Sequence, residues 1–348
     1  MKRVLFLYTE LAEYFLACLQ TLQPAEYEVH VVRWPVNKEA PFALRTLNHI
    51  HLQNRDRFTS DQVLTSWVLE LSVDVVFTSG WVDKGYMKVN RALKGQVPTV
   101  LLLDNHWNGS FKQQLARVLS GRLIHRYFSH AWVPGAYQRA FARKLGFEPD
   151  HIRDGFYCAD TALFDGFHAK RPAGSDPKRL LFVGRYLEFK GIFDLWQVFA
   201  ELHGEGFSDW ELWCAGSGDL WGQRVQHPAI KHFGFVQPQE LEQLVLGASA
   251  FVLPSHKEPW GVVIHEMAAA GLPLVCSDTV GAATRFVETG QNGYMHSPAD
   301  PDTLKAALKR LMSATPEQRI AMGQHSRKLA QSLSPAHWNR TLAAFIPS

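Results

Sequence analysis

Two glutamates, Glu258 and Glu266, stand eight residues apart around a segment whose sequence predicts the start of a helix. Residues 250–254 before them predict a buried strand closed by proline, and residues 267–270 continue the helix. Pro259 suits the first helical turn, where its missing N–H costs nothing. The free N–H groups at this positive helix end would bind an anion. They belong to Gly261, Val262 and Val263.

The spacing of the two carboxylates also suits a nucleotide sugar. Eight residues span roughly 12 Å at helical rise. That is about the reach from the ribose of a nucleotide to a sugar on its diphosphate. One glutamate would hold sugar hydroxyls and the other the ribose, with phosphate between them. The competing interpretation is that Glu258 and Glu266 are solvated helix carboxylates, since such pairs also occur by chance.

A second charged loop, residues 184–191, follows a predicted strand and opens a predicted helix at Ile192. It contains Arg185 and Lys190, whose side chains supply a forked contact and a point charge. Such cations would stabilise a nucleoside diphosphate, because the diphosphate gains negative charge as it leaves. A solvated surface loop is the alternative.

The run Glu-Pro-Trp-Gly-(x)4-Glu from Glu258 to Glu266 is followed by Ala-Gly-Leu-Pro-Leu-Val and by Gly-Gln-Asn-Gly-Tyr at residues 290–294. This pattern resembles the retaining glycosyltransferases of family 4, which have the GT-B fold. The resemblance implies an α/β protein with two Rossmann-like domains whose parallel sheets face each other across a cleft. It is strong from Leu180 to Gly293 and weak before about Ser129.

The resemblance also implies roles for other residues of the second half. Gly184, Arg185 and Lys190 match the element that grips the donor diphosphate. Gly216 and Gly218 would let the backbone approach the nucleotide, although a tight turn explains them as well. Phe235 and Val236 are expected beside the base. No cofactor and no metal are expected: the one Asp-x-Asp match, Asp300-Pro301-Asp302, opens a helix and is better explained by capping.

The first half is expected to bind the acceptor. The turn after the first strand lacks the glycines that many relatives have, and Glu10 faces either the acceptor or a helix dipole. Asp104 stands where the family often has a histidine, with His106 two residues later, and the sequence leaves open which of them acts. Trp81, with Asp83 and Lys84, is expected to border the acceptor.

Buried apolar strands alternate with helices in both halves, which indicates parallel α/β layering. We expect an acceptor domain over residues 1–165 and a nucleotide-sugar domain over 166–330. A C-terminal helix over 331–348 would return to the first domain. Residues 155–164 are interpreted as a linker and 172–177 as a boundary loop.

The chain has 348 residues, 46% of them hydrophobic and 20% charged, and its net charge of +3 is too small to indicate nucleic acid. Four scattered cysteines and no segment of ~20 apolar residues favour a cytoplasmic protein without membrane spans. Yet no acidic residue lies between His106 and Phe147, where seven cations alternate with apolar side chains. This stretch is either a solvated helix face or a contact with the anionic inner membrane surface.

Together these features predict a retaining glycosyltransferase, independent of metal. It would move a sugar from a UDP- or GDP-sugar to a hydroxyl of a glycan or lipid-linked acceptor, in cell-surface polysaccharide or lipopolysaccharide synthesis. The competing hypothesis is a catalytically silent GT-B protein that binds nucleotide sugars or serves as a scaffold.

Overall fold

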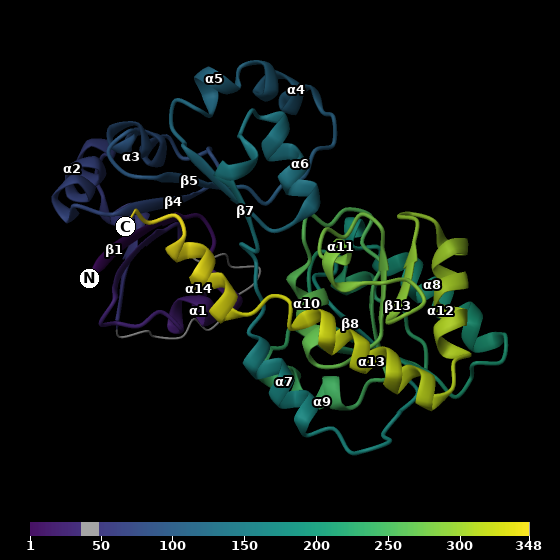
Figure 1. The fold of residues 1–348 in the computed structure, drawn as a ribbon. Helices are drawn as coiled ribbons and strands as arrows, with labels where there is room; N and C mark the ends of the chain where they lie inside the picture. Colours follow the sequence, from purple (N-terminus) through teal and green to yellow (C-terminus); the bar gives the residue numbers. More distant parts are fainter. Residues whose placement is uncertain (36–48, 348) are drawn as a thin grey trace. The chain divides into compact units, whose positions relative to one another are not determined.

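The computed structural model describes residues 1–35 and 49–347. Residues 36–48, within the predicted acceptor domain, and Ser348, at the end of the predicted C-terminal helix, lie outside the described residues. The chain divides into two compact units (Figure 1). Unit 1 comprises Met1–Cys158 and Pro335–Ser348, and unit 2 comprises Ala159–Ser334. The boundaries therefore fall at 158/159 and 334/335, whereas the sequence predicts 165/166 and 330/331.

Unit 1 is built on a parallel seven-stranded sheet in the order β3-β2-β1-β4-β5-β6-β7. Its central strands bury nearly continuous apolar runs, as a sheet covered on both faces requires. The strands are β1 (Lys2–Tyr8), β2 (Tyr27–Arg33), β3 (Ile50–Asn54), β4 (Val75–Ser79), β5 (Thr99–Leu102), β6 (His130–Val133) and β7 (Ile152–Asp154).

Most of the helices of unit 1 follow directly after its strands. Ser60 and Asp83 cap two of them by accepting hydrogen bonds from Val63 and Tyr86 at 3.2 and 3.0 Å. The helices before the return segment are α1 (Glu13–Gln20), α2 (Asp61–Leu71), α3 (Lys84–Leu93), α4 (Phe111–Val118), α5 (Ser120–Leu123) and α6 (Ala136–Lys144).

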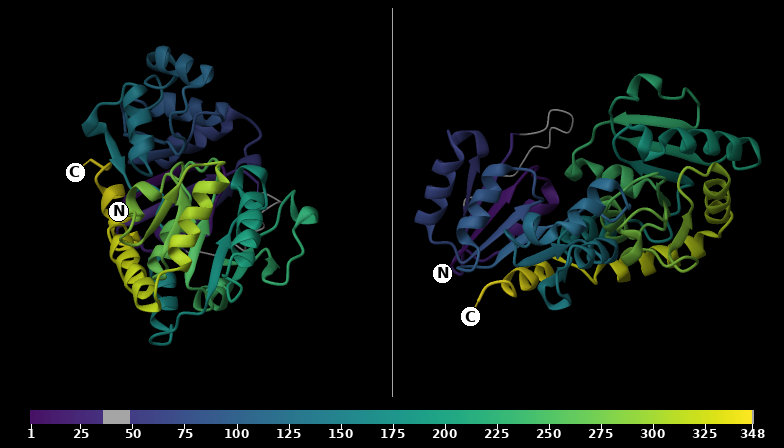
Figure 2. Two further views of the ribbon diagram at one scale, coloured as in Figure 1. Left: turned by 90° about the vertical axis from the view of Figure 1, so that its right-hand side faces the viewer. Right: turned by 90° about the horizontal axis from the view of Figure 1, so that it is seen from above.

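The last helix, α14 (Pro335–Ala343), completes the core of unit 1 and lies beside α1 (Figures 1 and 2). Trp338 is fully buried, and its indole packs at a tilt against that of Trp132, with ring centroids 4.8 Å apart. Its Nε1 donates to the Phe156 carbonyl at 2.8 Å. The two ends of the chain meet where Lys2 Nζ donates to the Pro347 carbonyl at 2.9 Å. Unit 1 therefore needs both ends of the sequence.

Unit 2 repeats the layering on a parallel six-stranded sheet in the order β10-β9-β8-β11-β12-β13. The strands are β8 (Arg179–Val183), β9 (Glu211–Ala215), β10 (Ile230–Gly234), β11 (Ala250–Leu253), β12 (Leu274–Ser277) and β13 (Gly293–His296). The helices are α7 (Thr161–Ala169), α8 (Ile192–Gly204), α9 (Glu242–Leu246), α10 (Val262–Ala269), α11 (Ala283–Phe286), α12 (Pro301–Met312) and α13 (Pro316–Ala330).

One sequence interpretation was wrong in its secondary structure. Residues 161–169 form α7 and belong to unit 2, where the sequence was interpreted as linker up to Phe164. The helix forms because Asp160 caps it, accepting from Leu163 N at 3.2 Å, and because Phe164 and Phe167 are buried.

Two further features concern membrane-spanning helices and cysteines. No helix within the described residues has the length and apolar character needed to cross a membrane. Cys18, Cys158, Cys214 and Cys276 are all buried free thiols.

Candidate functional site

The loops at the carboxyl ends of β8, β9 and β10 are joined by backbone hydrogen bonds. Gly184 N donates to Ala215 O at 3.0 Å, and Gly216 N donates to Gly234 O at 2.6 Å. A Cβ on Gly216 would overlap the Gly184 carbonyl, and one on Gly218 would press on the Tyr186 backbone. Glycine is therefore required at both positions, because the backbones of these loops lie too close together to leave room for a side chain.

The loop after β8 is also tied to the loop after β11. Gly191 has φ +67° and faces the Pro254 carbonyl so closely that a side chain would overlap it. His256 N donates to Phe189 O at 2.8 Å, and the His256 ring bonds Asp194 at 2.7 Å. These contacts hold the 3-10 turn Glu188–Lys190 against the loop that contains Glu258.

As a result, Lys190 and Glu258 form an ion pair. Their side chains are only 15% and 12% exposed, so the pair is largely screened from water. Ser255 Oγ lies 3.5 Å from the same carboxylate oxygen. The backbone of Glu258 is fixed as well, because Gly281 N donates to its carbonyl at 3.2 Å. Two residues predicted separately from the sequence thus share one charge-neutral cluster.

Helix α10 begins directly after this cluster. Gly261 is its N-cap with φ +83°, and a Cβ there would lie 3.0 Å from Glu258 Cγ. Val262 and Val263 are the first two helical residues, so their N–H groups lie at the helix N-terminus as predicted. Pro259 does not belong to the first turn, which corrects the sequence interpretation. The left-handed Gly261 starts the helix instead.

Glu266 lies within α10 and is partly exposed. Burial raises its pKa to about 7, and the charge of Asp160 adds to the rise. Near neutral pH this carboxyl is therefore poised between its neutral and charged forms.

His265, which the sequence analysis left without a role, anchors α10 in unit 2. Its Nδ1 accepts from Ala159 N and its Nε2 donates to Ala330 O, both at 3.1 Å. The ring stacks on Phe286 with centroids 4.1 Å apart. Because burial lowers its pKa to about 4, the imidazole is neutral. A histidine beside a candidate carboxylate is here a structural residue.

The remaining predicted donor residues lie on the same edge of the sheet. Arg185 is exposed in the loop after β8, between two residues that bond the β9 loop. Phe235 and Val236 are half-buried directly after β10. Carboxyl ends of parallel strands are where open α/β sheets bind ligands.

In unit 1, Asp104 follows β5 and is held by a tyrosine that the sequence analysis missed. Tyr157 O–H donates to Asp104 Oδ2 at 2.9 Å. Burial raises the pKa of Asp104. The ring of Tyr157 also packs against Tyr14 at 5.5 Å. Asp104 is thus a preorganised carboxyl in a tyrosine-lined site.

The other acceptor candidates differ in their surroundings. Glu10 is exposed in the turn after β1. The His106 ring packs edge-on against Tyr137 at 6.0 Å. Trp81 is half-buried against the core of unit 1. Asp83 caps α3 and also accepts hydrogen bonds from Trp34 and Arg55, so its carboxylate already has partners that stabilise the fold.

Comparison with known proteins bears on this arrangement of loops. Residues 164–329 match the family described as Glycosyl transferases group 1. The match spans just under half of the chain, and we call this segment the glycosyl transferases group 1 domain. It covers most of unit 2, including Lys190, Glu258 and Glu266.

Curated relatives are similar to part of the chain. A glycogen synthase of Mycobacterium tuberculosis is 37% identical over 168 residues, which cover 46% of this chain and 39% of the relative. A D-inositol 3-phosphate glycosyltransferase of Acidothermus cellulolyticus is 27% identical over 243 residues, which cover 64% and 52%. The matches therefore span about two fifths to one half of these relatives.

Solved structures show the fold of both units. HepE of Anabaena, solved in complex with UDP and glucose, has a TM-score of 0.74 at 18% identity and covers 99% of both chains. Sucrose-phosphate synthase from Thermosynechococcus elongatus has a TM-score of 0.70 at 18% identity, covering 99% and 98%. The two Rossmann-like units thus have the GT-B fold, as predicted.

Two observations concern metal. Asp300 caps α12 by accepting from Thr303 N at 3.1 Å, which explains the Asp-x-Asp match near the end of the glycosyl transferases group 1 domain. Among the described residues, Glu28, His30 and His51 have donor atoms within 4.8 Å of one another. Arg3 already binds the Glu28 carboxylate at 2.9 Å, and the two imidazoles stack at 4.6 Å. Independence from metal remains a prediction.

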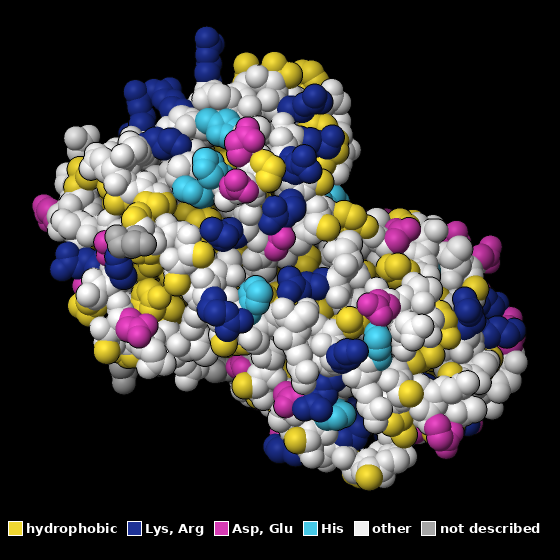
Figure 3. All heavy atoms as spheres, viewed as in Figure 1, with side chains coloured by type: hydrophobic (Ala, Val, Ile, Leu, Met, Phe, Trp, Pro, Cys, Tyr) yellow, Lys and Arg dark blue, Asp and Glu magenta, His cyan; other side chains and the backbone are white. Residues whose placement is uncertain are grey.

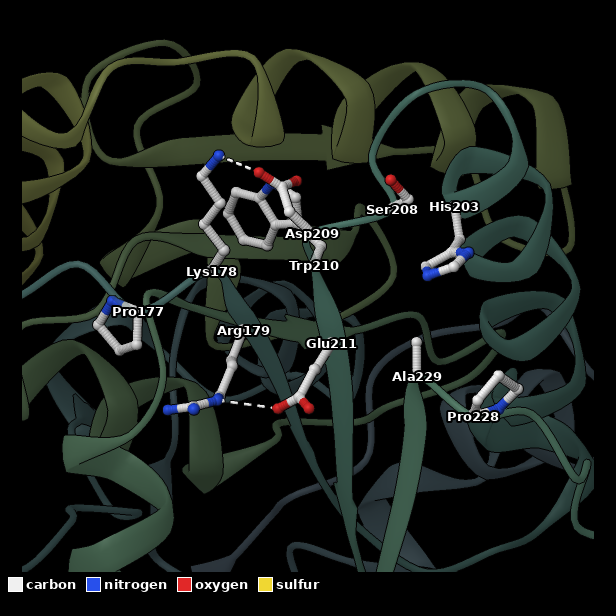
Figure 4. Close-up of a pocket in the computed structure, with 10 residues that line it drawn as sticks. All are labelled: Pro177, Lys178, Arg179, His203, Ser208, Asp209, Trp210, Glu211, Pro228 and Ala229. Atoms are coloured by element: carbon white, nitrogen blue, oxygen red, sulfur yellow. Dashed lines mark hydrogen bonds and ion pairs between the residues drawn. The ribbon is translucent and has the colours of Figure 1, made fainter.

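The glycosyl transferases group 1 domain also has a pocket of about 520 Å³ at the opposite edge of its sheet (Figure 4). Its walls include the first residues of β8 and β9, Arg179 and Glu211, which pair at 2.9 Å. Lys178 pairs with Asp209 in the same wall. Because it lies at the first residues of β8 and β9, this pocket is distinct from the donor loops at the carboxyl ends of the same strands.

Proposed function

We propose that the protein is a retaining glycosyltransferase of family 4. It moves a glycosyl group from a nucleoside-diphosphate sugar to an acceptor hydroxyl. The single observation that carries the proposal is the Lys190–Glu258 pair at the N-terminus of α10, within the glycosyl transferases group 1 domain. A cation, a carboxylate and free N–H groups at one helix end match a diphosphate with a sugar attached.

In this mechanism the donor diphosphate lies against the start of α10. Lys190 and Arg185 stabilise the negative charge that the diphosphate gains as its bond to the sugar breaks. The acceptor oxygen bonds the anomeric carbon on the same face, and its proton passes to a phosphate oxygen of the leaving group. No metal is needed, because the two cations and the helix dipole supply the positive charge.

The carboxylates have separate roles in the proposal. Glu258 holds hydroxyls of the transferred sugar and, through its pair with Lys190, fixes the ammonium before the donor arrives. Glu266 binds the ribose hydroxyls, for which its ionised form is the stronger acceptor. Phe235 and Val236 contact the base.

Unit 1 supplies the acceptor side of the proposal. Asp104, held by Tyr157, accepts a hydrogen bond from a sugar hydroxyl. Of the two candidates the sequence left open, Asp104 is favoured over His106 because its carboxyl is already oriented. Glu10 and Trp81 border the acceptor, a glycan or lipid-linked hydroxyl of cell-surface polysaccharide or lipopolysaccharide synthesis.

A ligand screen tests the proposal. UDP-, GDP- and ADP-sugars are each added in a thermal melt, since a ligand that binds the folded state raises its stability by mass action. We expect one nucleotide series to raise the Tm and the Lys190→Ala variant to lose the shift. Lys328→Ala, an exposed lysine on α13 of the same unit, is the matched control.

Sugar transfer is then measured with the donor that binds. Transfer with retained anomeric configuration supports the proposal. Binding with no transfer to any acceptor would favour a silent binding protein, and no shift with any nucleotide would contradict the donor site itself.

A further inference from the structure

Helix α4 and the short α5 expose an apolar stripe that no other described element of unit 1 covers. Only Ala116 of α4 is buried. Phe111 and Val118 are 80% and 79% exposed, and Leu115 between them is 45% exposed. Leu119 and Leu123 continue the stripe at 36% and 43%. A surface helix normally turns such a stripe toward the core. Here it faces outward, which marks an interaction surface.

Positive charge surrounds this stripe. Lys112, Arg117, Arg122 and Arg126 are all exposed on the same two helices and the turn that follows them. Among the described residues, none of the four forms an ion pair with a carboxylate. By contrast, Arg139 in the same acid-free stretch pairs with Asp154 at 2.9 Å. The upper part of Figure 3, over α4 and α5, shows yellow and dark blue side chains together.

We propose that this surface docks on an anionic lipid bilayer. The five apolar side chains enter the boundary between headgroups and acyl chains, and the four cations contact lipid phosphates. Charge complementarity favours lipid over a second copy of the chain, because a second copy would bring the same positive charge against itself.

The inference deepens the proposed function by naming the surface on which the acceptor is met. A lipid-linked acceptor would then reach unit 1, which presents both this surface and Asp104. Binding at the membrane needs no donor, so it is measured separately from transfer.

Vesicle flotation tests the docking surface. Purified protein is mixed at low salt with phosphatidylcholine vesicles, with and without phosphatidylglycerol. We expect flotation only with the anionic vesicles, and release as salt screens the contact. Arg117→Gln/Arg122→Gln/Arg126→Gln should lower the partition coefficient on the order of 100-fold, because each cation near the surface contributes about fivefold. Equal binding to neutral vesicles, or none to either, would overturn the inference.

A second variant tests the apolar part. Phe111→Ser/Val118→Ser should reduce flotation by at least about tenfold, since two buried side chains are lost from the bilayer. Val63→Ser/Leu69→Ser on α2, where the side chains are 48% and 46% exposed, is the matched control and should float like wild type.

Light scattering and nucleotide melts complete the test. If the wild type is a dimer that Phe111→Ser/Val118→Ser makes monomeric, the stripe joins two copies and the lipid inference is wrong. An unchanged nucleotide-induced Tm shift in both docking variants shows that they are folded. It also separates failure of docking from failure of the donor site.

Discussion

At the scale of single residues, the Lys190–Glu258 pair makes an asymmetric prediction. Glu258→Gln removes the charge that neutralises Lys190, so the ammonium becomes available to phosphate. We expect nucleoside-diphosphate affinity to stay equal or become tighter, while turnover falls about 10²-fold as a contact of the transition state is lost. Calorimetry and initial rates measure the two effects. A variant that loses affinity and keeps its turnover would assign Glu258 to the nucleotide instead.

Glu266 makes a prediction about pH. Its pKa of about 7 means that the carboxyl gains its charge between roughly pH 6 and 8. Because ribose hydroxyls bond the charged form better, nucleotide affinity should rise across this range. The Glu266→Gln variant should bind up to tenfold more weakly at pH 8. The diphosphate also titrates, but it does so equally with wild type and with Glu266→Gln. The difference between their two profiles of affinity against pH therefore reports the Glu266 carboxyl alone. Parallel profiles would remove Glu266 from the ribose site.

The same pKa affects stability with a definite sign. A carboxyl whose pKa is raised on folding binds more protons in the folded state, so the free energy of unfolding falls as pH rises from about 4.5 to 7. His265 has the opposite sign. Its pKa of about 4 makes stability fall as pH drops from about 6.5 to 4. Glu266→Gln should therefore gain stability over wild type with rising pH, by about 3 kcal/mol near pH 7. Thermal melts at pH 5 and pH 8 measure this gain, and an equal Tm difference at both would contradict it.

At the scale of elements, the glycine loops make a prediction about folding. Gly216→Ala places a Cβ on the Gly184 carbonyl and should cost at least about 2 kcal/mol. Gly222→Ala lies in the next turn, with no atom within 4 Å of the added Cβ, and should change stability by less than about 0.5 kcal/mol. Denaturant unfolding measures both. Equal stability of the two variants would mean that the β8 and β9 loops are not joined as described.

The sequence predicted the elements whose signals are local. Buried apolar runs located most strands, including β8 and β11. The helix after β11 was predicted too, but with Pro259 in its first turn, whereas α10 begins at Val262. It missed β3, whose residues Ile-His-Leu-Gln-Asn lack an apolar run. It also left α13 unassigned, because few of its residues are apolar.

Long-range contacts account for what the sequence could not show at the site. Lys190 and Glu258 are 68 residues apart, and their pairing depends on the close approach of Gly191 to Pro254. Tyr157 lies 53 residues from Asp104 in a segment interpreted as linker. Local motifs marked Lys190 and Glu258 as candidates one by one. They could not show that these two residues contact each other, or that Tyr157 contacts Asp104.

At the scale of the whole molecule, the hydrophobic core of unit 1 is complete only when α14, the last helix of the chain, packs into it. Trp338 is fully buried among Phe6, Phe15 and Trp132. Trp338→Ala should therefore cost about 3–5 kcal/mol in the stability of unit 1. Trp221→Ala is the control, because it removes an indole that is partly exposed and lies in unit 2. Amide hydrogen exchange would show which unit loses stability. Loss of amide protection in unit 2 rather than in unit 1 would contradict the assignment of α14 to unit 1.

In the proposed mechanism, protein cations and no metal hold the leaving diphosphate. Turnover in excess EDTA tests it most directly, with wild type, Arg185→Ala, Lys190→Ala and the control Lys328→Ala assayed in parallel. We expect wild type and the control to keep full activity, while Arg185→Ala and Lys190→Ala each lose at least ~10²-fold in rate. Activity that disappears with EDTA and returns with magnesium, with both cation variants near wild type, would contradict it.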